Sequence, residues 1–183
     1  MGVTDGEAGL QVRTRTTNGF TLVELMIVVV IIGVLSVLAI TGYRKYTYAA
    51  RNAEAVQFLG GVRAAQLAYY QANGVFCGST SEAVWPRDLP SVDSGKIRWN
   101  DPADPIPANN AWHDLAVESP GSVWFRYRMA AGRPGQDGGA AIRNSNRPWF
   151  WAQANGDFDS NGVLSTFEVT SEKPEVYRHN ENE

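Results

Sequence analysis

The residues best suited to bind a ligand form a twelve-residue acidic segment near the C-terminal end of the sequence. Its pattern, D-x-D-x-N-G-x5-E, matches a calcium-binding loop at every constrained position. Calcium takes roughly six to eight oxygen ligands at about 2.3–2.6 Å, so oxygens from alternate residues must surround one point. The sequence therefore predicts a structural Ca²⁺ site. The ion would be held by the side chains of Asp157, Asp159 and Asn161 and by the backbone carbonyl of Val163. Ser165 would bind it through water, and Glu168 would bind it with both carboxylate oxygens.

The residues around this loop are typical of strands rather than helices. Pro148 and the pair Asn155-Gly156 disfavour an entering helix, and residues 166–170 are β-prone. Because an EF-hand sensor needs a helix on each side of its loop, we expect a static clamp that joins two strands. A simple Asx/Gly turn without metal is the alternative, and it does not account for Glu168.

A second unusual segment is the apolar run 20–40, in which 17 of 21 residues are apolar. As a helix it would be about 31 Å long, close to the ~30 Å of bilayer hydrocarbon. The alternative is a secretory signal peptide, but no small-residue cleavage site follows the run, and Tyr43-Arg-Lys-Tyr46 stands there instead. The run is therefore interpreted as a retained membrane-spanning helix.

Glu24 is the only charged residue in this run. A carboxylate at the centre of a membrane helix costs roughly 2.5–3.5 kcal/mol on insertion scales. Glu24 lies near one end of the run, so it is either a tolerated interfacial charge or a carboxylate that a cation from elsewhere neutralises.

The segment Gly19-Phe-Thr-Leu-Val-Glu24, followed directly by the apolar run, resembles the processing site of type IV prepilins and pseudopilins. The resemblance covers residues 1 to about 72. It implies that a prepilin peptidase cleaves between Gly19 and Phe20, and that the new amine of Phe20 is methylated. It also implies that Glu24 pairs with the Phe20 amine of a neighbouring subunit during assembly.

The same resemblance implies where the protein is found and what it contacts. Before assembly the chain would cross the bacterial inner membrane once, with a cytoplasmic N-terminus. It would then join an extracellular filament at the cell surface as a homopolymer with other pilin subunits. A pilus or secretion assembly platform would be a further partner.

The fold class expected is α+β, with one long helix packed on a small antiparallel sheet as in pilins. The helix would continue to about residue 72, because an apolar stripe runs from Ala55 to Tyr69 at helical spacing and Asn73-Gly74 follows. Strands are expected at 123–129, 149–154, 166–170 and near 175–178. The predicted organisation is a cleaved leader (1–19), a membrane or filament-core helix (20–42), an amphipathic helix (43–73), a variable connection (74–122), and a sheet with the calcium loop and tail (123–183).

Composition limits the remaining possibilities. The net charge of −3 over 183 residues gives no electrostatic reason to expect nucleic acid as a partner. One cysteine, Cys77, excludes an internal disulfide, and two histidines argue against a Cys/His zinc site. No Ser/His/Asp, Cys/His or Gly-rich constellation indicates catalysis, so no enzymatic activity is expected.

The sequence thus predicts a structural subunit of a type IV pilus, a surface filament used for motility, adhesion or DNA uptake. A pseudopilin of a type II secretion system is the closest alternative, because it shares the leader and the helix. A membrane-anchored calcium-binding regulator is an alternative from another class.

Overall fold

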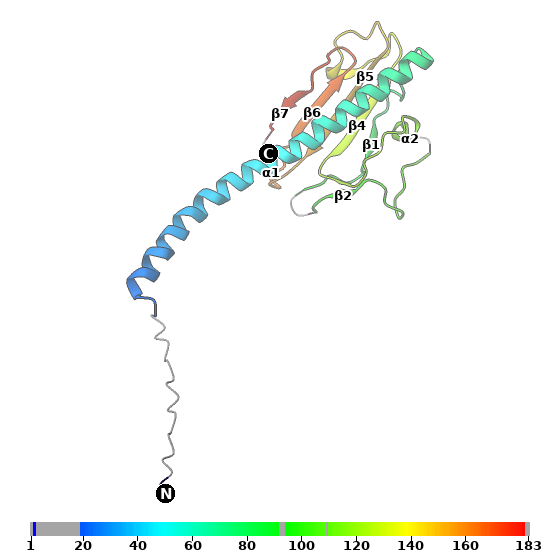
Figure 1. Ribbon diagram of the computed structural model, residues 1–183. Coiled ribbons are helices and arrows are strands. Elements are labelled where there is room, and N and C mark those ends of the chain that lie inside the picture. Colours follow the sequence, from blue (N-terminus) through cyan, green and yellow to red (C-terminus); the bar gives the residue numbers. More distant parts are fainter. Residues whose placement is uncertain (1, 3–18, 92–93, 109, 182–183) are drawn as a thin grey trace. The chain divides into compact units, whose positions relative to one another are not determined.

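The computed structural model describes residues 2, 19–91, 94–108 and 110–181, and the chain divides into two compact units, Met1–Tyr43 and Arg44–Glu183 (Figure 1). Most of the predicted leader therefore lies outside the described residues. One long helix, α1 (Leu22–Asn73), contributes residues to both units. The described part of the first unit, beyond Gly2, is the N-terminal portion of this helix and the three residues before it.

Helix α1 ends where the sequence predicts. No proline interrupts the chain between residues 20 and 85. At the C-terminal end Gly74 adopts φ +72°, and its N–H donates to the Tyr70 carbonyl at 2.8 Å. A glycine in this left-handed conformation is a common way to close the last turn of a helix. The predicted stop at Asn73-Gly74 is confirmed.

The second unit contains a five-stranded antiparallel sheet, so the predicted α+β class is confirmed. Its strand order is β1-β4-β5-β6-β7. All four predicted strand segments are present, although the first contributes only its second half to this sheet. The strands are β1 (Ala83–Trp85), β4 (Arg126–Gly132), β5 (Trp149–Gly156), β6 (Ser165–Thr170) and β7 (Tyr177–His179).

The main core contains one stripe of α1 and one face of this sheet. Ala55, Leu59 and Val62 of the predicted stripe are completely buried. On the sheet, Tyr127 of β4 lies opposite Ala154 of β5, and both belong to the same core. Within the second unit, Figure 1 shows α1 lying along the sheet over β4 and β5. The small side chain of Ala154 leaves space for the bulky residues packed around it.

The opposite face of the sheet carries a smaller apolar cluster. Trp149 and Trp151 of β5 pack there with Ala130 of β4 and with Ile142. Ile142 directly follows the short 3₁₀ helix η1 (Gly139–Ala141), in the connection between β4 and β5. Both faces of the central strands therefore bury tryptophan or other large apolar side chains.

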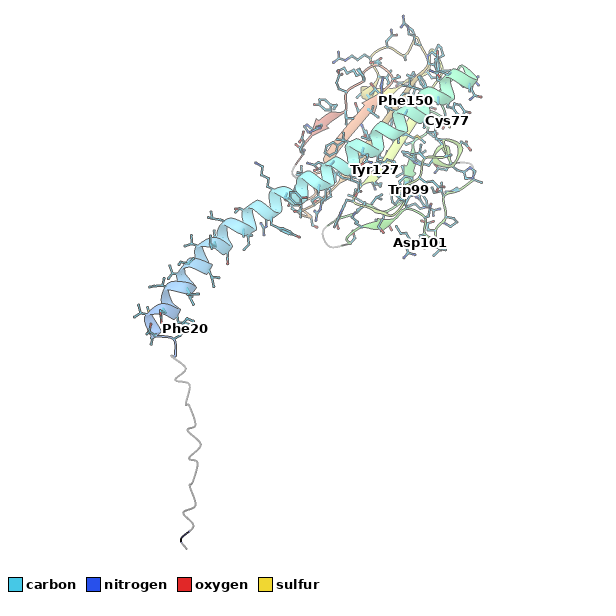
Figure 2. The ribbon with its side chains drawn as sticks, in the orientation of Figure 1. Phe20, Cys77, Trp99, Asp101, Tyr127 and Phe150 are labelled. Atoms are coloured by element: carbon cyan, nitrogen blue, oxygen red, sulfur yellow. The ribbon has the colours of Figure 1, made fainter. Side chains whose placement is uncertain are left out.

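The predicted variable connection 74–122 contributes to both the sheet and the core. It supplies edge strand β1 and three fully buried tryptophans. It also forms α2 (Ala111–Asp114) and β2 (Ile97–Arg98), which pairs with β3 (Ser122–Val123) in a separate two-stranded sheet. Figure 2 shows one of these tryptophans, Trp99, near Tyr127, and the centroids of the two rings are 5.8 Å apart. The tryptophans are Trp85, Trp99 and Trp112.

Candidate functional site

The apolar run lies on the surface of the described structure. Its large hydrophobic side chains, from Leu22 to Ile40, are each 46–74% exposed, and Phe20 is 87% exposed. Among the described residues, α1 is the one helix long and apolar enough to cross a membrane, with a mean hydropathy of 3.0 over its most apolar window. Water is a poor environment for so much contiguous apolar surface, which requires lipid or other helices around it.

Glu24 forms a capping box with Thr21 at the start of α1. One carboxylate oxygen, Oε2, accepts from the Thr21 N–H at 2.9 Å and from its hydroxyl at 2.8 Å. In return the Thr21 hydroxyl oxygen accepts from the Glu24 N–H at 3.2 Å. These bonds satisfy donors that the first turn of a helix otherwise leaves free. Sequence reasoning treated Glu24 only as a charge, although the T-x-x-E pattern itself is a capping signal.

The predicted cleavage position lies just outside the helix. Gly19 and Phe20 are exposed and precede α1, and the space where a side chain at Gly19 would project is open. Backbone outside regular hydrogen bonding is accessible for binding in an extended form by a peptidase. Residues 3–18, which precede this position, lie outside the described residues.

The predicted calcium loop joins β5 to β6 as a hairpin connection, in which Gly156 pairs with Ser165. The expectation of strands on both sides is confirmed. Asp157 is 8% exposed, and its Oδ2 accepts from the Gly162 N–H at 3.1 Å. Its other oxygen, Oδ1, is buried and has no hydrogen-bond partner in the described structure.

The next two acidic or amide side chains are folded into the same loop. Asp159 Oδ1 accepts from the Asn161 N–H at 3.2 Å, and Asp159 Oδ2 accepts from the Asn161 amide at 2.8 Å. Asn161 Oδ1 accepts from the Val163 N–H at 2.6 Å. Three oxygen-bearing side chains thus come from one short turn, and Gly162 at φ +84° permits the bend.

In the described structure Glu168 is engaged outside this loop. It lies in β6 opposite Gln153 of β5, whose amide donates to Glu168 Oε2 at 2.6 Å. Glu168 is three residues beyond Ser165, roughly 10 Å along a strand at about 3.3 Å per residue. The hydroxyl of Ser165 donates to the Asn180 carbonyl at 2.7 Å, and its oxygen keeps lone pairs that can accept a further bond.

The chemistry of the remaining donors suits a hard cation. They are two carboxylates and one amide, with the Val163 carbonyl nearby in sequence, and oxygen donors of this type are the ligands that Ca²⁺ prefers. Within the described ranges, no three His, Cys, Asp or Glu side chains converge on one point. A complete four-carboxylate or His/Cys metal centre is therefore not formed by the described residues.

Cys77 is buried and unpaired, in agreement with its being the one cysteine of the sequence. Burial, with a contribution from the negative charge of Asp114, raises the pKa of the Cys77 thiol to about 11. A thiol at this pKa is almost entirely protonated at neutral pH and is a poor nucleophile. Nothing at this position supports catalysis by a cysteine.

The comparisons with known proteins identify the N-terminal segment. Residues 14–40 match the prokaryotic N-terminal methylation motif. The chain is 39% identical over 75 residues to type IV major pilin protein PilE of Neisseria gonorrhoeae, which is 41% of this chain and 40% of the relative. It is also 40% identical over 74 residues to fimbrial protein EcpC of Eikenella corrodens, covering 40% of this chain and 42% of the relative.

A fimbrial protein of Neisseria meningitidis serogroup B is 40% identical over 66 residues, 36% of this chain and 39% of the relative. The chain thus spans about two fifths of the length of the curated relatives it matches. No solved structure matches it. The chain carries the prokaryotic N-terminal methylation motif of prepilins, and over about two fifths of its length it is similar to type IV pilins.

Proposed function

We propose that this protein is a structural subunit of a type IV pilus and that it polymerises through the apolar part of α1. The observation that carries the proposal is the exposed apolar surface from Leu22 to Ile40, which lies within the matched N-terminal methylation motif of residues 14–40. A helix that is apolar on all sides is stable both in lipid and among copies of itself. The names of the relatives, type IV major pilin and fimbrial protein, support the same function.

Processing would begin while the apolar segment lies in the inner membrane. A prepilin peptidase would cleave between Gly19 and Phe20, and the new amine of Phe20 would be methylated. The exposed, non-helical position of this bond supports the proposal. The mature chain would then leave the membrane through a pilus assembly platform and enter the surface filament.

Glu24 would pair with the Phe20 amine of a neighbouring subunit. Both hydrogen bonds from Thr21 go to Oε2 of Glu24, so Oε1 can accept a bond from an ammonium group without loss of the cap. A carboxylate and an ammonium attract each other strongly in a low-dielectric environment, where each is costly alone. The pair would therefore favour one register between neighbouring helices.

The test is N-terminal mass spectrometry of filaments sheared from cells that express the wild-type chain. The expected result is a mature N-terminus at methylated Phe20 in the sheared fraction. Gly19→Val should leave the full-length precursor in the membrane fraction, whereas Gly9→Val, a change within the leader, should be processed normally. Recovery of uncleaved chains in filaments, or no chain in the sheared fraction of wild type, contradicts the proposal.

No finding favours a type II secretion pseudopilin over a pilin, because the relatives described above are named as pilins or fimbrial proteins. A membrane-anchored regulator, unlike a pilus subunit, would stay unpolymerised in the membrane fraction after shearing. The experiment above therefore also separates the filament subunit from a regulator.

A further inference from the structure

We propose that the loop between β5 and β6 binds one Ca²⁺ ion through Asp157, Asp159 and Asn161, without Glu168. We further propose that the bound ion stabilises the contact of this loop with α1. The proposal is independent of filament assembly, because all the residues that it uses belong to the second unit. It differs from a twelve-residue EF-hand cage, which needs a bidentate carboxylate at its last position.

The first argument is the state of Asp157. Its side chain is 8% exposed, and Oδ1 is buried without a hydrogen-bond partner among the described residues. The same carboxylate is turned into the loop, because Oδ2 accepts from the Gly162 N–H. A buried carboxylate oxygen with no donor is strongly destabilising, and a bound cation supplies the missing positive charge.

The second argument is the chemistry of the neighbours. Asp159 and Asn161 place a carboxylate and an amide in the same turn as Asp157, and one oxygen of each is held by a backbone N–H of the loop. The backbone thus orients the side chains before any ion arrives. On binding, the ion would compete with the Asn161 amide for Asp159 Oδ2.

The donor set selects the type of ion. It contains only oxygen atoms, which suits Ca²⁺ or Mg²⁺ rather than zinc or copper. A flexible loop with water in the remaining positions suits Ca²⁺, because Mg²⁺ demands near-ideal octahedral geometry and releases its water reluctantly. With two carboxylates and no bidentate ligand, we expect a dissociation constant of about 10⁻⁴–10⁻³ M, the range of extracellular modules.

Phe158 connects the loop to α1. It lies between Asp157 and Asp159 in the sequence, and its side chain is 1% exposed. Its ring packs edge-on against Phe125 of the linker before β4, at 5.1 Å between centroids, and the Arg51 guanidinium of α1 lies 4.8 Å from its centre. An ion that fixes the residues on both sides of Phe158 would therefore restrict its movement away from Arg51.

The experiment uses the full-length chain, purified in detergent and depleted of metal with a chelator. Ca²⁺ is titrated in by calorimetry, with Mg²⁺ as the competing ion. We expect one Ca²⁺ per chain and at least tenfold weaker binding in Asp159→Asn. Asp159 is exposed, so this variant should fold normally, and circular dichroism checks that it does. Asp137→Asn, an acid in the loop after β4, is the matched control and should bind like wild type.

Glu168→Gln distinguishes the two possible loops. The short loop predicts a change of less than twofold, whereas a loss as large as that in Asp159→Asn would overturn the short loop in favour of the twelve-residue cage. The absence of saturable heat with the wild-type chain would overturn the site altogether. Saturable binding that Asp159→Asn leaves unchanged would place the ion elsewhere and overturn it as well.

Hydrogen exchange tests the link to α1 separately. Saturating Ca²⁺ should slow exchange at least threefold in the segment 48–55, and should leave the exchange of residues 64–70, farther along the same helix, unchanged. If Ca²⁺ binds as expected but exchange in 48–55 does not slow, the link through Phe158 is wrong.

Discussion

The side chain of Gln66 forms a pair of hydrogen bonds with the backbone of Cys77. Its amide nitrogen donates to the Cys77 carbonyl at 2.8 Å, and its amide oxygen accepts from the Cys77 N–H at 2.9 Å. Gln66 is completely buried. The arrangement fixes the first residues after α1 against the helix, where the chain turns back toward the sheet.

Replacement of this glutamine should therefore destabilise the second unit. In Gln66→Leu, the N–H and the carbonyl of Cys77 would both stay buried without partners, at about 1–3 kcal/mol for each group. We expect the free energy of unfolding to fall by about 2–6 kcal/mol, measured by urea denaturation in detergent. Gln71→Leu, at an exposed position of the same helix, is the control and should change the stability little. Equal effects in the two variants would contradict the role of the pair.

The two functions of Glu24 can be separated by substitution. Glu24→Gln keeps an oxygen that can complete the capping box but removes the negative charge, whereas Thr21→Ala keeps the charge and removes the side-chain half of the cap. If charge pairing drives assembly, Glu24→Gln should reduce sheared filaments at least tenfold and Thr21→Ala much less. Quantitative immunoblots of sheared and membrane fractions measure both. A severe loss in Thr21→Ala alone would assign the role of Glu24 to capping.

Arg51 of α1 contacts two aromatic rings and should stabilise the contact of α1 with the two segments that carry them. Its guanidinium lies 4.0 Å from the centre of the Trp124 ring and 4.8 Å from that of Phe158. A cation over an aromatic face contributes about 0.5–2 kcal/mol, depending on exposure. Arg51→Met, which keeps much of the apolar stem, should lower the free energy of unfolding by about 1–2 kcal/mol. Arg44→Met, at an exposed position of the same helix, should have little effect, and equal losses would argue against the aromatic contact.

The thiol of Cys77 predicts how stability depends on pH. Its pKa rises on folding from an ordinary value of 9.0 to about 11. Above pH 9 the unfolded chain therefore loses this proton while the folded chain keeps it, so stability should fall as the pH rises from 9 to 11. Burial also raises the pKa of Tyr127, with a contribution from Glu54, and adds to the same trend.

Denaturation between pH 8 and 11 in wild type and Cys77→Ala isolates the thiol, because the Tyr127 contribution is common to both. The wild-type curve should be steeper, and parallel curves would show that the thiol does not titrate as expected. In native protein at pH 8, Cys77 should react with a disulfide reagent at least a hundredfold more slowly than in urea-unfolded protein, because the folded thiol is protonated and buried.

Local patterns in the sequence were sufficient to predict much of the fold. The apolar stripe from Ala55 to Tyr69 depends only on near neighbours in the chain, and the structure confirms it. The same holds for the strand predicted at 123–129, whose second half forms the start of β4. The stop at Gly74 likewise follows from the conformational freedom of one residue. These elements could be predicted because a single period or a single residue type determines them.

Other features depend on residues that are distant in the sequence. Pairing of β6 with β5 places Glu168, a predicted ligand of the calcium loop, opposite Gln153. Sequence spacing contains no information about that register. In the same way, no periodicity of the sequence predicts that Trp85, Trp99 and Trp112 enter the core, because they come from an irregular, proline-rich connection. The Gln66–Cys77 pair has no local signature either.

The strands at the two edges of the five-stranded sheet, β1 and β7, each contain only three residues. Such an edge offers few unpaired backbone groups to a strand from another molecule. Cross-β stacking of these domains is therefore disfavoured, even at the very high local concentration reached when many copies are crowded together. Copies of the second unit that are held side by side can therefore remain separately folded, without pairing between the edge strands of their sheets.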